Sequence, residues 1–174
     1  MTSTAEASKK TSGKSPLNTR FFSHATLECK DIACTRKFFE EFLGFETVLM
    51  APVAFWARMG GDQIIVVVKM PQDKKDKMPL LNHNGLDVNS DQDVDAAYEI
   101  VRRDAEKWGL HRISRPSTQH GTYSFYFWDR DDNCWEILSN PPGGYTWAFQ
   151  MGDQQGAGHT SKAFVRPQTE SAKG

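Results

Sequence analysis

The chain has 174 residues, of which 39% are apolar, with 21 basic and 22 acidic side chains. This length suits one domain whose core needs no disulfides, and a net charge of −1 excludes the dense basic surface that nucleic acid or an anionic membrane requires. Neither a run of about 18 apolar residues for a spanning helix nor a secretory signal is present, so we expect a cytoplasmic protein.

Along the first half of the chain, short segments in which apolar and polar residues alternate, as in a strand, flank a segment with apolar residues at helical spacing. Residues 1–19 are mostly Ser, Thr, Lys and Ala, which predicts a disordered tail. Residues 24–29 alternate between the two faces of an expected strand. An amphipathic helix is predicted next, with Asp31 as its cap and Gly44 after its end. Further strands are expected at about 45–49, 53–59 and 63–70.

The same order of patterns then repeats. The segment HNGLD at 83–87 alternates as HATLE does at 24–28. A second helix is predicted from the cap Ser90 to Gly109, and three strands follow at about 112–115, 122–129 and 134–138. We therefore predict an α+β fold of two βαβββ modules, at about 20–70 and 80–140, in a single domain over 20–140. Residues 141–174 are an extension that forms a lid, a dimer contact or an external tail.

Strand alternation predicts which side chains share a space. If the apolar residues of the strands pack under the helices, His24 and His83 point to the opposite face. Glu136 points to that face too, because its neighbours Trp135 and Ile137 are the natural core residues. Two imidazoles and one carboxylate form an octahedral ligand set with open positions, which suits Fe(II) or Mn(II). Alternatively, the histidines are paired polar residues near a sheet edge and Glu136 is an exposed carboxylate.

Two stretches of the sequence resemble the vicinal oxygen chelate family, over about residues 20–140. SHATLECKDIACTRKFFEEFLGFETV resembles the opening of its module, and FYFWDRDDNCWEIL resembles its closing hairpin. The family contains glyoxalase I, bleomycin-resistance proteins, fosfomycin-resistance enzymes and type I extradiol dioxygenases. The resemblance implies two paired βαβββ modules that form a U-shaped mixed sheet around a divalent metal. Carried over by position, the metal ligands are His24, His83 and Glu136, and a homodimer is expected.

The closing part of the chain further resembles type I extradiol dioxygenases. Their signature is a His, a Tyr, a turn and the metal-binding Glu, and His120, Tyr126 and Glu136 stand here in that order. The resemblance implies cleavage of a catechol-like aromatic diol by O2. In that reaction the diol chelates the metal, and Tyr126 and His120 are the catalytic residues that supply protons. Fe(II) is the expected metal, with Mn(II), Ni(II) or Zn(II) as alternatives.

Other functions within the same family stay open. Glyoxalase-like lyases and isomerases take a fourth ligand, a Glu, from the end of the first module, where this chain has Ile64–Val68. Fosfomycin-resistance transferases hold a phosphonate with an Arg shortly after the metal-binding Glu, and no Lys or Arg lies between Glu136 and Lys162. The third alternative is a metal-free protein that sequesters a ligand, as bleomycin-resistance proteins do. Such proteins generally lack the two ligand histidines.

Overall fold

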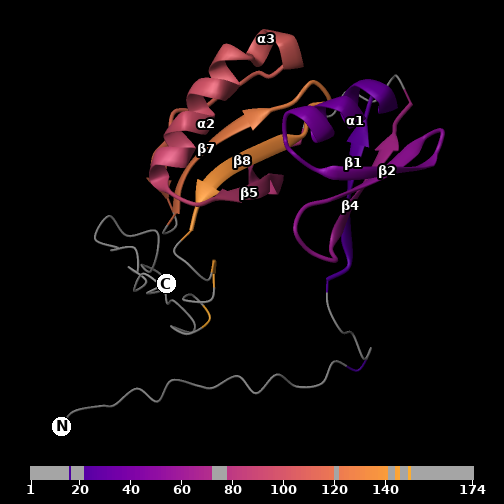
Figure 1. Ribbon diagram of the computed structural model, residues 1–174, viewed down its shortest axis with the longest axis horizontal. Helices are drawn as coiled ribbons and strands as arrows, with labels where there is room; N and C mark the ends of the chain where they lie inside the picture. The colour runs from indigo at the N-terminus through magenta and orange to yellow at the C-terminus, as the bar shows by residue number, and fades with distance from the viewer. Residues whose placement is uncertain are drawn as a thin grey trace.

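The computed structural model describes residues 16, 22–71, 78–119, 122–140, 144, 145 and 149. Within these ranges the chain forms two modules of like construction, each a strand, helix and three strands in order (Figure 1). The predicted N-terminal tail and C-terminal extension lie almost wholly outside the described residues. None of the helices in the described ranges is long and apolar enough to cross a membrane.

The first module has the predicted elements in the predicted order. They are β1 (His24–Cys29), α1 (Ile32–Glu41), β2 (Glu46–Ala51), β3 (Ala54–Arg58) and β4 (Ile64–Lys69). The helix begins where predicted, because the side chain of Asp31 accepts a hydrogen bond of 2.7 Å from the backbone N of Cys34. After its end Gly44 adopts a φ of 80°, which a residue without a Cβ does at little cost.

The second module repeats this order with one short helix before it and one after its main helix. Its elements are the 3₁₀ turn η1 (Leu80–Asn82), β5 (Asn84–Val88), α2 (Asp91–Arg103), α3 (Ala105–Trp108), β6 (Ser117–Gln119), β7 (Thr122–Trp128) and β8 (Cys134–Ser139). Ser90 caps α2 by accepting a 3.2 Å hydrogen bond from the backbone N of Asp93. The helix predicted to run unbroken to Trp108 is interrupted at Asp104, where ψ is 8°.

The strand predicted at 112–115 is wrong. Arg112 has a φ of 50°, in the left-handed region, so the backbone cannot stay extended through it. An isolated bridge joins His111 to Trp128 there, and the first of the three strands after α2 in the described chain is β6 instead. β6 pairs antiparallel with β7, with Ser117 opposite Ser124.

The two modules have the same sheet topology, which confirms the repeat seen in the sequence. Each is a four-stranded sheet, with strand orders β1-β4-β3-β2 and β5-β8-β7-β6. The first strand pairs parallel with the last, and the other pairs are antiparallel. His24 is the first residue of β1, and His83 directly precedes β5. These two strands are therefore the edge strands of two separate sheets.

The helices and the inner faces of both sheets enclose one hydrophobic core. α1 of the first module packs against the second module, because the ring centroids of Phe39 and Trp135 are 5.5 Å apart and those of Phe38 and Trp108 are 5.9 Å apart. Phe39 and Trp135 are fully buried. Burial of large aromatic side chains from both modules stabilises their mutual packing, since each contributes a large apolar area. The opposite faces of the sheets are left for the candidate site.

Candidate metal and catalytic site

Strand pairing brings Glu136 and Tyr126 together on the helix-free face of the second sheet. Tyr126 on β7 lies opposite Glu136 on β8, and Gly85 on β5 lies opposite Glu136 on its other side. Trp135 and Ile137 belong to the core on the helix side, as the alternation predicts. Glu136 is only 7% exposed and Tyr126 8%. A carboxylate buried to this degree requires hydrogen bonds or a cation.

His83 lies just before β5 and contacts both of these residues. Its Nδ1 is 2.6 Å from the backbone oxygen of Leu80, and its Nε2 is 3.2 Å from Oε2 of Glu136. Its ring meets that of Tyr126 edge-on, with 5.0 Å between centroids. The structure therefore brings together two of the predicted metal ligands and one predicted catalytic residue.

The hydrogen bond to Leu80 determines the tautomer of a neutral His83 ring. It places the proton on Nδ1 and the lone pair on Nε2, which faces the carboxylate of Glu136. A carbonyl oxygen only accepts hydrogen bonds, so Nδ1 must carry the proton that it shares with Leu80. In a neutral ring, Nε2 then directs its lone pair at Glu136 Oε2, and two lone pairs 3.2 Å apart repel. A proton or a cation on Nε2 removes this repulsion. The arrangement fits a divalent metal, whose histidine ligands commonly donate their other N–H to a backbone carbonyl.

Tyr126 is held in its protonated form. Burial raises the pKa of Tyr126 to about 12, and its hydrogen bond to the Glu136 carboxylate and the charge of that group act in the same direction. The nearby hydroxyl of Ser124 lowers the pKa and offsets part of this effect. At neutral pH the phenol therefore donates to Glu136 and keeps a proton available beside the site.

Residues 78–82, to which the sequence analysis assigned no helix or strand, position His83. The indole Nε1 of Trp128 donates a 2.8 Å hydrogen bond to the backbone oxygen of Met78, whose side chain packs against Tyr126 and Trp128. The η1 turn then directs the carbonyl of Leu80 at the imidazole. Pro79, the residue before a single turn that ends at His83, is the sequence signal that could have revealed this support.

Gly85 leaves space beside the Glu136 carboxylate. A Cβ at this position would lie 2.9 Å from Cδ2 of Leu138 and 3.8 Å from Oε2 of Glu136. Any other residue would therefore displace Leu138 and cover the carboxylate. This role was also missed in the sequence, where Gly85 reads only as a polar position in an alternating strand.

The third predicted ligand, His24, lies apart from the other two. It is exposed on β1, in the other sheet, and its Nδ1 is 2.8 Å from Oγ of Ser23. Among the residues with described positions, no group of three or more His, Cys, Asp and Glu side chains could hold a metal ion. The first sheet also supplies no carboxylate from β4, whose residues on the His24 face are Ile64, Val66 and Val68. The predicted catalytic residue His120 lies outside the described residues.

Solved structures with the same fold come from several bacteria. The fosfomycin resistance protein FosX from Listeria monocytogenes, in complex with Mn(II) and sulfate, is 19% identical with a TM-score of 0.57, over 75% of this chain and 98% of that one. A possible glyoxalase from Bacillus cereus is 21% identical with a TM-score of 0.56, over 69% and 99% of the two chains. A lactoylglutathione lyase from Agrobacterium tumefaciens is 16% identical with a TM-score of 0.52, over 70% and 94%.

Sequence comparison gives the family. No curated protein sequence matches the chain. The sequence model of the Glyoxalase/Bleomycin resistance protein/Dioxygenase superfamily matches residues 21–137, which include both modules and all three predicted ligands. With the repeated βαβββ topology and the His83–Glu136 pair already described, this match shows that the chain belongs to the Glyoxalase/Bleomycin resistance protein/Dioxygenase superfamily.

Proposed function

We propose that the protein is a metal-dependent, extradiol-type dioxygenase that cleaves the ring of a catechol-like aromatic diol with O2. The contact between His83 Nε2 and Glu136 Oε2, with the Tyr126 phenol against the same carboxylate, is the observation that carries this proposal. This arrangement combines two of the three proposed metal ligands with a proton donor. Cleavage of a diol that chelates a metal requires both a metal and a proton donor.

The metal is held in this proposal by His24, His83 and Glu136. Fe(II) is the preferred ion, and Mn(II), Ni(II) or Zn(II) would fit the same nitrogen and oxygen donors. A divalent metal bound there supplies a positive charge that favours the ionised diol and open positions for its oxygens and for O2. The carbonyl of Leu80 fixes the His83 tautomer that leaves Nε2 free for this role.

Tyr126 holds a proton at its phenol oxygen and is the acid of the proposed reaction. Its raised pKa keeps that proton in place at neutral pH, and its bond to Glu136 fixes the direction in which it points. Trp128 and the side chain of Met78 form an apolar wall around it, which limits access of water. His120, outside the described residues, stays a predicted second proton donor.

The charge of the site favours a neutral diol over an anionic substrate. Along the three strands nearest Glu136, the side chains on its face are neutral or acidic in the described chain. They are Asp87, Thr122, Ser124, Tyr126, Trp128, Cys134 and Leu138. Arg112 lies at the border of this face, with its guanidinium 5.8 Å from the centre of the Trp128 ring. A phosphonate dianion needs several cationic partners, whereas a catechol needs none.

The apolar residues beside His83 suit an aromatic ligand. Leu81 is 90% exposed and Leu80 46% exposed, although both belong to the turn that supports the imidazole. Exposed apolar side chains at the border of a site gain free energy when a flat apolar molecule covers them. We therefore expect the aromatic ring of the substrate to lie near this turn.

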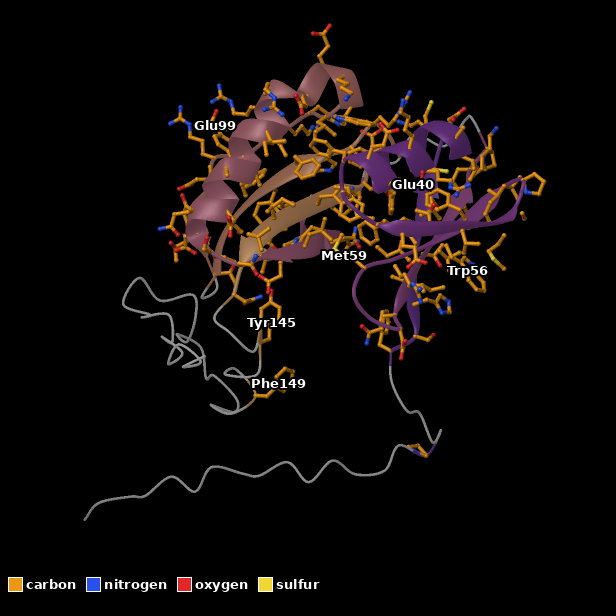
Figure 2. All side chains as sticks on the ribbon, in the orientation of Figure 1. Glu40, Trp56, Met59, Glu99, Tyr145 and Phe149 are labelled. Carbon is orange, nitrogen blue, oxygen red and sulfur yellow. The ribbon has the colours of Figure 1, made fainter. Side chains whose placement is uncertain are left out.

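A homodimer is the second part of the proposal, because it would supply the missing imidazole. His24 shares its face of the first sheet with Val48 and Trp56, which are 52% and 40% exposed. Trp56 projects from β3 to the outside of the molecule (Figure 2). An exposed apolar face of this kind favours association. In the dimer, His24 of one copy joins His83 and Glu136 of the other.

Oxygen uptake by iron-loaded protein tests the proposed function. Protein purified without oxygen and loaded with Fe(II) is mixed with a panel of substituted catechols. We expect O2 consumption and a yellow ring-opened product, and His83→Ala should lose both the metal and the activity. His111→Ala is the matched control, because that ring bonds Asp132 at 3.1 Å instead.

Either of two other results would contradict the proposal that the protein is a dioxygenase. Bound metal without O2 uptake on any catechol would indicate a metal-dependent transferase, lyase or isomerase of the same family. Wild-type protein that retains no divalent metal would indicate a protein that sequesters a ligand.

A further inference from the structure

We infer that the diol carries an ammonium group on a short side chain, and that Asp87 and Asn140 bind this group. The inference rests on the proposed function and narrows its substrate class. Asp87 belongs to β5, and Asn140 directly follows β8. Together they form a polar subsite on the same face of the second sheet as Glu136. The subsite lies beyond Glu136 from His83, which precedes β5.

Strand register places this polar subsite within reach of a diol bound at Glu136. Asp87 lies opposite Leu138, two residues after Glu136, so its side chain points to the same face as Glu136. Residues two apart on a strand are separated by about 7 Å, and neighbouring strands by about 4.8 Å. A ring whose one edge borders the turn at Leu80 can therefore extend a short substituent from its opposite edge to Asp87.

Unpaired polar atoms mark this end of the face. In the described chain, two buried side-chain oxygens have no hydrogen-bond partner, Oδ1 of Asn140 and Oγ of Ser124. Ser124 lies opposite Leu138, and Asn140 follows Leu138 by two residues, so both belong to this face. The Ser124 hydroxyl is near enough to the Tyr126 phenol to lower its pKa, but it does not have the geometry of a hydrogen bond. Buried polar atoms are nearly always paired, so these two indicate where a ligand group or a water binds.

The chemistry of the polar subsite selects a hydrogen-bond donor. Asn140 is only 8% exposed, and its unpaired amide oxygen can only accept. Its backbone N donates a 2.9 Å hydrogen bond to Oδ1 of Asp87, so the two residues are neighbours. An ionised carboxylate also only accepts. A group that binds both residues must therefore donate at least two hydrogen bonds, as an ammonium group does.

The charges on this face favour a cationic donor over a neutral one. Asp87 is exposed, and its one hydrogen bond in the described chain is to the uncharged backbone of Asn140. The charges of Glu136 and of an ionised diol are balanced when a divalent metal is bound, which leaves Asp87 without a counter-charge. Arg112 lies over Trp128, at the other end of the face. An ammonium group would balance Asp87, whereas a carboxylate would be repelled.

Binding of three matched catechols tests this inference. The full-length protein is loaded with Zn(II), which is not redox-active, and is titrated by calorimetry without oxygen. The ligands are dopamine, which has an aminoethyl chain, hydroxytyrosol, which has a hydroxyl in place of the ammonium group, and homoprotocatechuate, which has a carboxylate. We expect dopamine to bind about tenfold more tightly than hydroxytyrosol, and homoprotocatechuate to bind more weakly than both.

Substitutions in the polar subsite locate the preference. Asp87→Asn should make dopamine and hydroxytyrosol bind equally, because it removes the charge but keeps an oxygen that accepts the bond from Asn140. Asn140→Ala should weaken dopamine binding by about threefold, the effect of one lost hydrogen bond. Asp95→Asn is the matched control, since that carboxylate bonds Tyr123 on the helix side, and it should keep the wild-type preference.

The outcomes separate this inference from the proposed reaction. Equal binding of dopamine and hydroxytyrosol by the wild-type protein would show that water alone fills the polar subsite and would overturn the inference, as would a preference that survives in Asp87→Asn. Neither result would contradict the dioxygenase. A preference for dopamine without O2 uptake by the Fe(II)-loaded protein would support the polar subsite and contradict the dioxygenase. Failure of the metal-loaded protein to bind any of the three catechols would overturn both.

Discussion

A single backbone carbonyl defines the chemistry of His83. With Nδ1 committed to Leu80, only Nε2 is left to face Glu136, where a proton or a cation removes the repulsion between two lone pairs. The same carboxylate accepts the phenol of Tyr126. At the scale of residues, the site is thus a carboxylate with a proton donor on one side and an imidazole nitrogen on the other.

Tyr126→Phe should slow turnover by about 10²-fold without loss of the metal. The substitution removes the proton donor but leaves the aromatic packing and both donor groups of the metal in place. Metal content and kcat on the best catechol are the measurements. Tyr123→Phe is the control, because that phenol bonds Asp95 at 2.8 Å on the helix side. Turnover at the wild-type rate in Tyr126→Phe would assign the residue a packing role only.

Gly85→Ala should weaken metal binding by about tenfold, because its Cβ would displace the Leu138 side chain, 2.9 Å away, and contact the Glu136 carboxylate at 3.8 Å. A metal titration with a chelating indicator measures this. Gly61→Ala is the matched control, as a Cβ there has no atom within 4 Å and the backbone is not left-handed. Equal metal affinity of the two variants would show that the space beside Gly85 is not needed.

At the scale of elements, the turn between β7 and β8 joins the two modules. Asp129 is fully buried and accepts hydrogen bonds from the Trp135 indole and the Asn133 backbone, both 2.9 Å long. The Asn133 side chain donates in turn to the backbone oxygen of Glu28 in the first module, at 3.0 Å. Lys30 adds a 2.7 Å bond from its backbone N to Asp131. The turn thus connects the end of β1 to the hairpin that carries Glu136.

This turn makes stability depend on pH. Burial raises the pKa of Asp129 from 3.8 to about 6, although the hydrogen bonds from Trp135 and Asn133 oppose the rise. The folded protein therefore binds this proton more tightly than the unfolded chain. Its contribution to the free energy of unfolding is complete below about pH 4 and is lost as the pH rises to about 6, by at most about 3 kcal/mol.

Urea unfolding of wild type and Asp129→Asn between pH 4 and pH 7 measures this contribution. The difference in free energy of unfolding between the two proteins should decrease as the pH rises over this range, since the variant cannot titrate there. A constant difference for Asp129→Asn would mean that its pKa is the same in the folded and unfolded states.

At the scale of the whole molecule, the two modules carry parts of one proposed metal site on separate sheets. His24 stands on the first sheet, and His83 and Glu136 stand at the second. If a second copy completes each site, a subunit that lacks His24 and a subunit that lacks His83 can together form one complete site. The first subunit supplies His83 and Glu136, and the second supplies His24.

Mixing His24→Ala with His83→Ala should therefore restore activity that neither variant has. After subunits exchange, half of the dimers are mixed and each contains one complete site, so about a quarter of wild-type activity is expected. His83→Ala mixed with Glu136→Gln is the control, because both defects affect the same part of the site. Recovery in the control, or none in the first mixture, would exclude a site shared in this way.

The sequence by itself determined the repeated module, the side-chain alternation and the ends of the helices. These features depend on neighbouring residues only: period-two alternation put Glu136 and Tyr126 on one face, and Asp31 and Ser90 cap helices within a few residues. The strand predicted at 112–115 was wrong because a single residue, Arg112, adopts a left-handed conformation that its type does not predict.

Only the tertiary structure decided how the site is built. The contact of His83 with Glu136 joins residues 53 positions apart, and the tautomer of His83 depends on a carbonyl whose direction no side-chain pattern records. It also showed that His24 belongs to a different sheet from its predicted partners. Alternation gives the face on which a side chain lies, but the packing of two modules around a common core determines which faces meet.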